Sequence, residues 1–275
     1  MSASQKRGQI DIQNLQVTFE RWGNKIQALN NVSMTVPAGQ WLMLVGPNGS
    51  GKSTILKTMS GRLKPDNGGV RIDGSSIVGM NAEQLSNAVF LVHQDPLLGS
   101  APLLTVYENM LVADNKLHAQ NADLTDIVLP VDAVETSFSF VRILQVIRRL
   151  RGNKKLEEKY SNLLKPYGLD SRLKQPVKTL SGGERQLLAL LIAGLRPSSV
   201  ILLDEPLAAL DPEKTEQCIE QIRALHRQGR TIIQVTHDEE LTATLGDRTV
   251  ALRNGEVVFD ETDKETRQKV NTRSR

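Results

Sequence analysis

The stretch from Gly46 to Ser53 constrains this chain more than any other segment. It matches the pattern G-x-x-x-x-G-K-[ST], a glycine-rich loop that cradles phosphate groups. An apolar run at 41–45 precedes it and indicates a buried strand, and a helical pattern at 53–60 follows, which Gly61 can end. Strand, loop and helix N-terminus together predict an anion site, because backbone N–H groups and the helix dipole both favour negative charge there.

This loop predicts a site for a nucleotide and its metal ion. The loop amides surround the phosphates, the Lys52 ammonium reaches the β- and γ-phosphates, and the Ser53 hydroxyl is suited to ligate Mg²⁺. The alternative is an ordinary glycine-rich turn between a strand and a helix. The predicted phosphate-binding residues are Gly46, Pro47, Asn48, Gly49, Ser50, Gly51, Lys52, Ser53 and Thr54.

The composition bounds the class of protein. The chain has 275 residues, of which 39% are hydrophobic and 24% charged, as in a soluble α/β protein with a sizeable core. A net charge of +3 does not indicate nucleic acid, and no such partner is expected. The single cysteine, Cys218, rules out an intramolecular disulfide and a cysteine-rich metal cluster. Neither a signal peptide nor an eighteen-residue apolar run occurs, so no membrane span is expected.

The apolar pattern predicts an α/β fold with the phosphate loop in its core. Alternation at 10–19 and 32–36 indicates antiparallel strands before the loop. Continuous apolar runs at 89–92, 200–203 and 231–236 indicate buried strands after it. A hairpin with an Asn-Gly turn is predicted near the C-terminus, from Val250 to Phe259, and a helix with Pro212 in its first turn from Glu213 to Arg227.

The chain divides into a central domain and two polar ends. We expect a disordered tail at 1–9, one domain at 10–260 that contains an inserted helical subdomain at about 95–180, and a polar, poorly ordered tail at 261–275, beginning near Asp260. Within the helical subdomain, Thr105 is a candidate N-cap for a helix. Little sequence follows the last hairpin, so a further C-terminal domain is not expected.

The helical subdomain concentrates basic side chains. Apolar residues recur at helical spacing from Phe140 to Leu150. Basic residues occupy the other faces of this helix and the positions just beyond it: Arg142, Arg148, Arg149, Arg151, Lys154 and Lys155. Glu157 and Glu158 partly offset their charge. Two interpretations stay open. The segment is either a solvated face of the subdomain or a surface near anionic lipid head groups or a membrane partner.

Two carboxylates follow the apolar run at 200–203. A carboxylate at the C-terminal end of a buried strand lies next to the bound phosphates in this type of fold, so Asp204 is expected to hold Mg²⁺. Glu205 is the candidate general base that polarises the attacking water. The alternative is a surface acidic pair after a strand.

The stretch from Leu180 to Gln186, which reads LSGGERQ, predicts a second phosphate site. A serine and two glycines open a helix over 184–195, so a hydroxyl and exposed N–H groups meet at a helix N-terminus. One γ-phosphate cannot lie at both loops of one subunit unless the fold brings the loops together.

This stretch resembles the signature of the ATP-binding cassette (ABC) family, and the resemblance extends from about 10 to 260 with the motifs in the family order. It implies an ATPase with ATP and Mg²⁺ as cofactors, built as a phosphate-loop core with an antiparallel β subdomain and a helical subdomain. In the family two such domains pair head to tail, and the signature of one caps ATP on the phosphate loop of the other. The signature positions are Ser181, Gly182, Gly183 and Glu184.

Four more positions match motifs of this family. Gln94 resembles the glutamine-loop residue, which touches Mg²⁺ and the attacking water, and His237 resembles the switch histidine, which contacts the γ-phosphate. Asp211 lies in a stretch similar to the aspartate-containing loop at the dimer interface. Trp22 stands where the family places an aromatic side chain against adenine, with stacking by Phe19 or plain core packing as alternatives.

The resemblance also implies partners and a location. It points to the ATPase subunit of a bacterial importer that works with separate transmembrane permease subunits, a second ATPase subunit in a homodimer, and in some systems a substrate-binding protein. Such a subunit is peripheral, at the cytoplasmic face of the inner membrane. The apolar helix at 187–195 and the stretch 245–248 are similar to import ATPases linked to amino-acid-like solutes.

Two other classes of function remain as rivals. A soluble ABC ATPase acting on nucleic acid or ribosomes is disfavoured, because the 103–175 segment is too short for a coiled-coil arm and one cysteine cannot build a zinc module. A non-hydrolysing regulatory module is disfavoured because Glu205 and His237 are both present.

Overall fold

The computed structural model describes residues 7–21, 23–114 and 147–262. The chain forms two compact units. Unit 1 comprises Met1–Leu91, Ser198–Pro206 and Leu225–Arg275, and unit 2 comprises Val92–Pro197 and Leu207–Ala224. The predicted domain limits at 10–260 and about 95–180 stay predictions.

Most strands of a six-stranded sheet belong to unit 1, in the order β10-β9-β3-β8-β7-β6. Strand β3 pairs in parallel with β8 and β9, and β7 pairs in parallel with β8, whereas β9 and β10 form an antiparallel hairpin. The continuous apolar runs predicted these strands because a parallel sheet is buried on both faces. The strands are β3 (Trp41–Val45), β6 (Val89–Val92), β7 (Val200–Asp204), β8 (Thr231–Val235), β9 (Arg248–Arg253) and β10 (Glu256–Glu261).

A second, four-stranded sheet in unit 1 has the order β2-β1-β4-β5, and its recorded pairs are antiparallel. Alternate residues of its long strands are buried, as the period-two pattern predicts for a sheet with one covered face. The strands are β1 (Ile10–Arg21), β2 (Asn24–Val36), β4 (Asn67–Ile72) and β5 (Ser75–Ser76).

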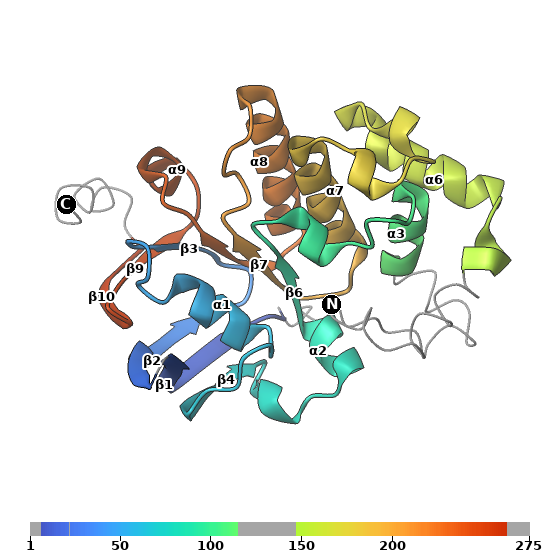
Figure 1. Ribbon diagram of the computed structural model, residues 1–275. Coiled ribbons are helices and arrows are strands. Elements are labelled where there is room, and N and C mark those ends of the chain that lie inside the picture. Colours follow the sequence, from blue (N-terminus) through green and yellow to red (C-terminus); the bar gives the residue numbers. More distant parts are fainter. Residues whose placement is uncertain (1–6, 22, 115–146, 263–275) are drawn as a thin grey trace, which may run out of the picture. The chain divides into compact units, whose positions relative to one another are not determined.

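Helix α1 (Lys52–Met59) begins at the end of the predicted phosphate loop and shares one hydrophobic core with both sheets. Its Ile55, Leu56 and Met59 are almost fully buried among side chains from β1, β3, β7 and β8. Figure 1 shows α1 beside the strands of the four-stranded sheet. Two short helices, α2 (Ala82–Ala88) and α9 (Glu239–Thr244), complete unit 1 and were not predicted from the sequence.

Unit 2 is mainly helical. Thr105 caps α3 in a reciprocal pair with Glu108, which confirms it as an N-cap. Helix α7 begins two residues before the predicted start, directly after Ser181, and packs with α3. The apolar side chains of α7 are mostly buried. The helices are α3 (Val106–Ala113), α6 (Lys154–Leu164), α7 (Gly182–Leu195) and α8 (Pro212–Arg227), whose last turn belongs to unit 1.

The ordered ends reach further than the sequence suggested. Gly8, placed in the predicted tail, donates its N–H to the Asp73 carboxylate, and its carbonyl accepts from the Thr231 hydroxyl. Strand β10 continues through Asp260 because Arg248 forms two hydrogen bonds with its carboxylate. An edge strand has one solvated face and therefore tolerates this polar sequence.

Of the helix predicted up to Leu150, residues 147–150 are described and are helical, and the rest lies outside the described residues. Across residues 7–21, 23–114 and 147–262, no helix combines the length and the apolar character needed to cross a bilayer.

Candidate functional site

The loop between β3 and α1 depends on glycine at two points where a side chain has no space. Gly46 has φ 142°, and a Cβ placed on it would lie 2.2 Å from the Leu252 carbonyl oxygen. Gly51 has φ 105° at the N-terminus of α1, where a Cβ would lie 2.6 Å from the carbonyl oxygen of Ala28. The loop backbone lies so close to β9 and β2 that a side chain has no space at either position. Only glycine takes both conformations without strain.

The Lys52 side chain bends back over this loop. Its Nζ donates to the carbonyl oxygens of Gly46 at 2.7 Å and Pro47 at 3.0 Å. The residue is 6% exposed. Burial lowers the pKa of the Lys52 ammonium, and the carboxylates of Glu205 and Asp204 oppose that effect. A cation therefore lies inside the loop, at the place where an anionic ligand is predicted.

Ser53 and Asp204 meet although they lie 151 positions apart. The Ser53 hydroxyl donates to Asp204 Oδ1 at 3.3 Å. Burial at the end of β7 raises the pKa of Asp204 and Glu205 raises it further, while the Ser53 hydrogen bond, Lys57 and Lys52 act in the opposite direction. A hydroxyl beside a carboxylate is a pair of hard oxygen donors, which fits the ligand preference of Mg²⁺.

Glu205 follows Asp204 in an uncommon backbone conformation. Its φ is 49°, and its N–H donates to the Val235 carbonyl oxygen of β8 at 3.2 Å. Such a conformation costs free energy and persists only where the surrounding structure holds it. Residues in such conformations cluster at functional sites. The side chain is 17% exposed, and its Oε2 lies 3.5 Å from Nδ1 of His237. The His237 side chain is 67% exposed, so a ligand can reach it.

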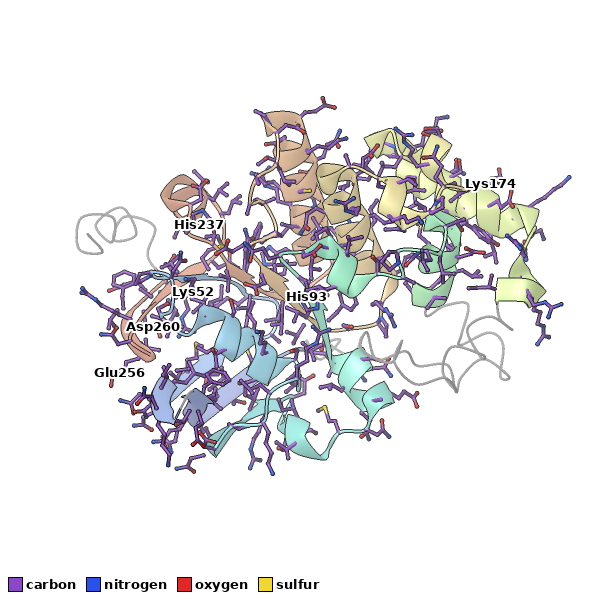
Figure 2. The ribbon with its side chains drawn as sticks, viewed as in Figure 1. Lys52, His93, Lys174, His237, Glu256 and Asp260 are labelled. Atoms are coloured by element: carbon purple, nitrogen blue, oxygen red, sulfur yellow. The ribbon has the colours of Figure 1, made fainter. Side chains whose placement is uncertain are left out.

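Unit 1 therefore brings five predicted site residues together. They come from α1 and from the ends of β7 and β8, which is the edge of a parallel sheet where ligands bind in open α/β folds. Figure 2 labels Lys52 at the start of α1 and His237 after β8. The five residues are Lys52, Ser53, Asp204, Glu205 and His237.

The LSGGERQ stretch forms a complete helix cap in unit 2. The Ser181 hydroxyl accepts from the Glu184 N–H at 3.2 Å, and the Glu184 carboxylate accepts from the Ser181 N–H at 2.7 Å. Gly182 faces open space, whereas a Cβ on Gly183 would lie 2.9 Å from Cγ of Lys214. Burial raises the pKa of Glu184, but the Ser181 hydrogen bonds and Arg172 outweigh it and leave the pKa below its ordinary value.

The remaining predicted site residues are Asp211, Gln94 and Trp22. Asp211 accepts from the Lys214 N–H at 2.8 Å and so caps the start of α8. Gln94 is exposed just before a short 3-10 helix at Pro96–Gly99. Trp22 lies outside the described residues, and the alternative adenine partner, Phe19, is 40% exposed on β1.

Three features of these sites were not predicted. The left-handed conformation of Glu205 has no signal in the sequence, because its residue type does not favour it. The ion pair between Arg172 and Glu184, at 3.4 Å, joins residues from separate elements. The Ser50 hydroxyl is buried in the phosphate loop and makes no hydrogen bond within the described part of the chain.

Comparisons with known proteins agree with this geometry. The family model described as "ABC transporter" matches residues 29–208. The tyrosine transport ATP-binding protein of Clostridioides difficile (strain R20291) is 34% identical over 260 residues, which cover 93% of this chain and 93% of that protein. The cell division ATP-binding protein FtsE of Streptococcus pneumoniae (strain D39) is 28% identical, with coverage of 92% and 96%.

A solved structure is similar over almost the same length. It is the dimeric post-hydrolysis state of an ATP-binding cassette bound to ADP and Pi, with a TM-score of 0.69 and 25% identity, covering 92% of this chain and 98% of the solved one.

Proposed function

Because this chain belongs to the ABC transporter family and is one of its ATPases, we propose that it powers the uptake of a small, amino-acid-like solute. ATPases of this family dimerise and work with transmembrane subunits. The proposal adds that the permease subunits are separate chains, that the ATPase is a homodimer, and that it sits at the cytoplasmic face of the inner membrane. It also includes a substrate-binding protein that delivers the solute to the permease from the opposite side of the membrane. The similarity to a tyrosine transport ATP-binding protein supports the solute class.

One observation carries the hydrolytic part of this proposal. The Ser53 hydroxyl lies 3.3 Å from Asp204 Oδ1, at the loop that holds Lys52, and Glu205 follows Asp204 directly. In this proposal the backbone N–H groups of Gly46 and of residues 48–54, together with the Lys52 ammonium, bind the phosphates of ATP.

Ser53, Asp204 and Gln94 would hold Mg²⁺, which supplies charge neutralisation on the phosphate oxygens when it is bound. Glu205 then accepts a proton from the attacking water. The hydrogen bond from its backbone N–H to the Val235 carbonyl holds the backbone from which the carboxylate side chain extends. His237 lies 3.5 Å from Glu205 and is proposed to contact the terminal phosphate as well.

The second loop is proposed to act across a dimer. The N–H groups at the start of α7, with Ser181, Gly182, Gly183 and Glu184, would face ATP bound to the partner subunit, and Asp211 would lie at the same interface. The helix N-terminus and its dipole support this assignment, because they favour an anion. Trp22 is proposed to stack on the adenine ring.

The substitution Glu205→Gln tests the role of the base. It keeps the shape of the side chain and removes the proton acceptor, so ATP should still bind while turnover falls by about 10²- to 10⁴-fold. Glu216→Gln on the exposed face of α8 is the matched control and should leave turnover unchanged. Unchanged turnover in Glu205→Gln would remove Glu205 as the base.

The biological role is tested by affinity purification of the tagged chain from native membranes in mild detergent, with mass spectrometry. Recovery of a multi-span permease supports transport, and a binding protein with it supports uptake. Recovery with ribosomes or nucleic acid and no membrane protein would favour a soluble ABC ATPase instead.

A further inference from the structure

Basic charge is concentrated in one short stretch of unit 2. Residues 148–155, here called the basic stretch, contain five basic and no acidic side chains, although the whole chain carries a net charge of only +3. The five are Arg148, Arg149, Arg151, Lys154 and Lys155, and all are exposed. The basic stretch leads into α6, the yellow-green helix in Figure 1.

The backbone of the basic stretch is held in place by hydrogen bonds and by one buried side chain. Ile147 is 4% exposed, and its carbonyl accepts from the Arg151 N–H at 2.8 Å. The Leu150 carbonyl accepts from the Tyr107 hydroxyl of α3 at 2.8 Å. Asn153 then caps α6. The charged side chains therefore project from a fixed backbone, so a bound surface need not order the chain first.

Two acidic groups near this stretch pair with other basic residues, and a third, Glu158, lies one turn after Lys154 on α6. Glu157 pairs with Lys174 at 3.2 Å, and the buried Asp114 pairs with Lys159. Figure 2 labels Lys174, the partner of Glu157. Arg151 approaches Glu108 only at 4.0 Å, and its own side chain is 74% exposed. Residues 148–158 hold five basic side chains against two acidic ones, Glu157 and Glu158, so this part of the chain has a net positive charge.

Folding stability does not account for the placement of these charges. Lys154 and Lys155 occupy the first turn of α6, where the helix dipole disfavours cations. An anionic surface outside the molecule would turn this unfavourable position into a favourable one. The exposed positions of the basic stretch also offer no large apolar side chain, because Leu150 is half-buried, so the aromatic or aliphatic anchor of a protein interface is missing from it.

We propose that the basic stretch binds the anionic head groups of a membrane surface. Arginine and lysine clusters of this size bind acidic phospholipids through charge, and guanidinium groups match phosphate oxygens. Nucleic acid displays the same phosphate chemistry, and the choice of a membrane rests on the proposed function, which places the chain at one. The contact adds a direct attachment to lipid that requires no permease.

Vesicle binding of the purified full-length chain tests this inference. The probes are vesicles of neutral phosphatidylcholine, with or without about one third phosphatidylglycerol, assayed by flotation at low and high salt. We expect binding only to the acidic vesicles and its loss at high salt, because screening shortens the reach of surface charges to a few ångströms. Each basic residue near such a surface contributes about fivefold to partitioning at low salt.

Two variants with equal charge change separate location from net charge. The first replaces the five basic residues of the stretch with glutamine, and the second replaces five exposed basic residues elsewhere: Lys64, Arg71, Lys165, Arg227 and Arg253. The first should lose roughly 10³-fold in partitioning and keep its ATPase rate in detergent, whereas the second should retain most of its partitioning.

Equal losses in the two variants would overturn the proposal, because net charge alone would then explain binding. Retention of vesicle binding in the first variant, or salt-sensitive binding of the wild-type chain to duplex DNA or RNA with none to acidic vesicles, would also overturn it. If vesicle binding fails while a permease still co-purifies, only this inference falls and the transport proposal stands.

Discussion

The tight approach of Gly46 to β9 makes a quantitative prediction about the phosphate loop. In Gly46→Ala the new Cβ would lie 2.2 Å from the Leu252 carbonyl oxygen and 2.9 Å from Ser50 Oγ, with φ at 142°. Strand β9 is paired on both sides, by β3 and β10, so the loop must move instead. Forced overpacking costs about 1–3 kcal/mol, and an unfavourable backbone conformation costs about 1–3 kcal/mol more.

Gly49 is the matched control within the same loop. Its φ is 81°, and a Cβ there would meet no atom within 4 Å. Gly49→Ala therefore carries only the strain of the left-handed conformation, about 1–2 kcal/mol. The free energy of unfolding should fall by roughly 2–6 kcal/mol in Gly46→Ala and by distinctly less in Gly49→Ala.

Urea unfolding, followed by circular dichroism, measures both losses, and calorimetric titration with ADP measures binding. Because Lys52 Nζ rests on the Gly46 carbonyl, displacement of residue 46 should also weaken ADP binding more than the change at residue 49. Equal losses of stability in the two variants would show that the close approach to Leu252 does not govern the loop.

Two further predictions concern buried carboxylates. Because burial raises the pKa of Asp204 above 3.8, its ionised form destabilises the fold at neutral pH. The substitution Asp204→Asn should therefore raise the free energy of unfolding at pH 7 by roughly 0.5–2 kcal/mol. The same substitution should weaken Mg²⁺-dependent ATP binding. This advantage should shrink as the pH falls through the raised pKa toward 3.8, since wild type then binds the proton, and a pH-independent advantage in urea unfolding would contradict it. Tyr160→Phe removes a 2.9 Å bond to the charged, buried Asp114 and should cost about 1.5–3 kcal/mol, whereas Tyr167→Phe, whose hydroxyl donates to the neutral Gln221, should cost about 1 kcal/mol. Equal costs in thermal unfolding of these two variants would refute the role of the charge.

The sequence predicted local features of the chain best. The loop after β3 was recognisable because eight contiguous positions supply the glycines, the lysine and the hydroxyl that bind phosphate. Thr105 was recognisable as a cap because its side chain acts on its own helix. Helix α2 escaped prediction because it buries none of its residues, so its sequence has no apolar period.

Long-range geometry was beyond such reasoning. Ser53 and Asp204 were each expected near Mg²⁺, but their 3.3 Å contact depends on how β7 and α1 pack across the core. The approach of His237 to Glu205 depends in the same way on neighbouring parallel strands. Asp260 was expected only as the last residue of the domain, and its pairing with Arg248 in strand β10 depends on a side chain twelve positions away.

The two carbonyl bonds of Lys52 have a consequence for the end of a catalytic cycle. An ATPase must empty its site once per turnover, and a phosphate that leaves would otherwise strand a buried ammonium without acceptors. Here the carbonyl oxygens of Gly46 and Pro47 take over that role at 2.7 Å and 3.0 Å. Departure of the product is then an exchange of hydrogen-bond partners for Lys52, and the two carbonyl bonds offset part of the free energy lost when the phosphate leaves.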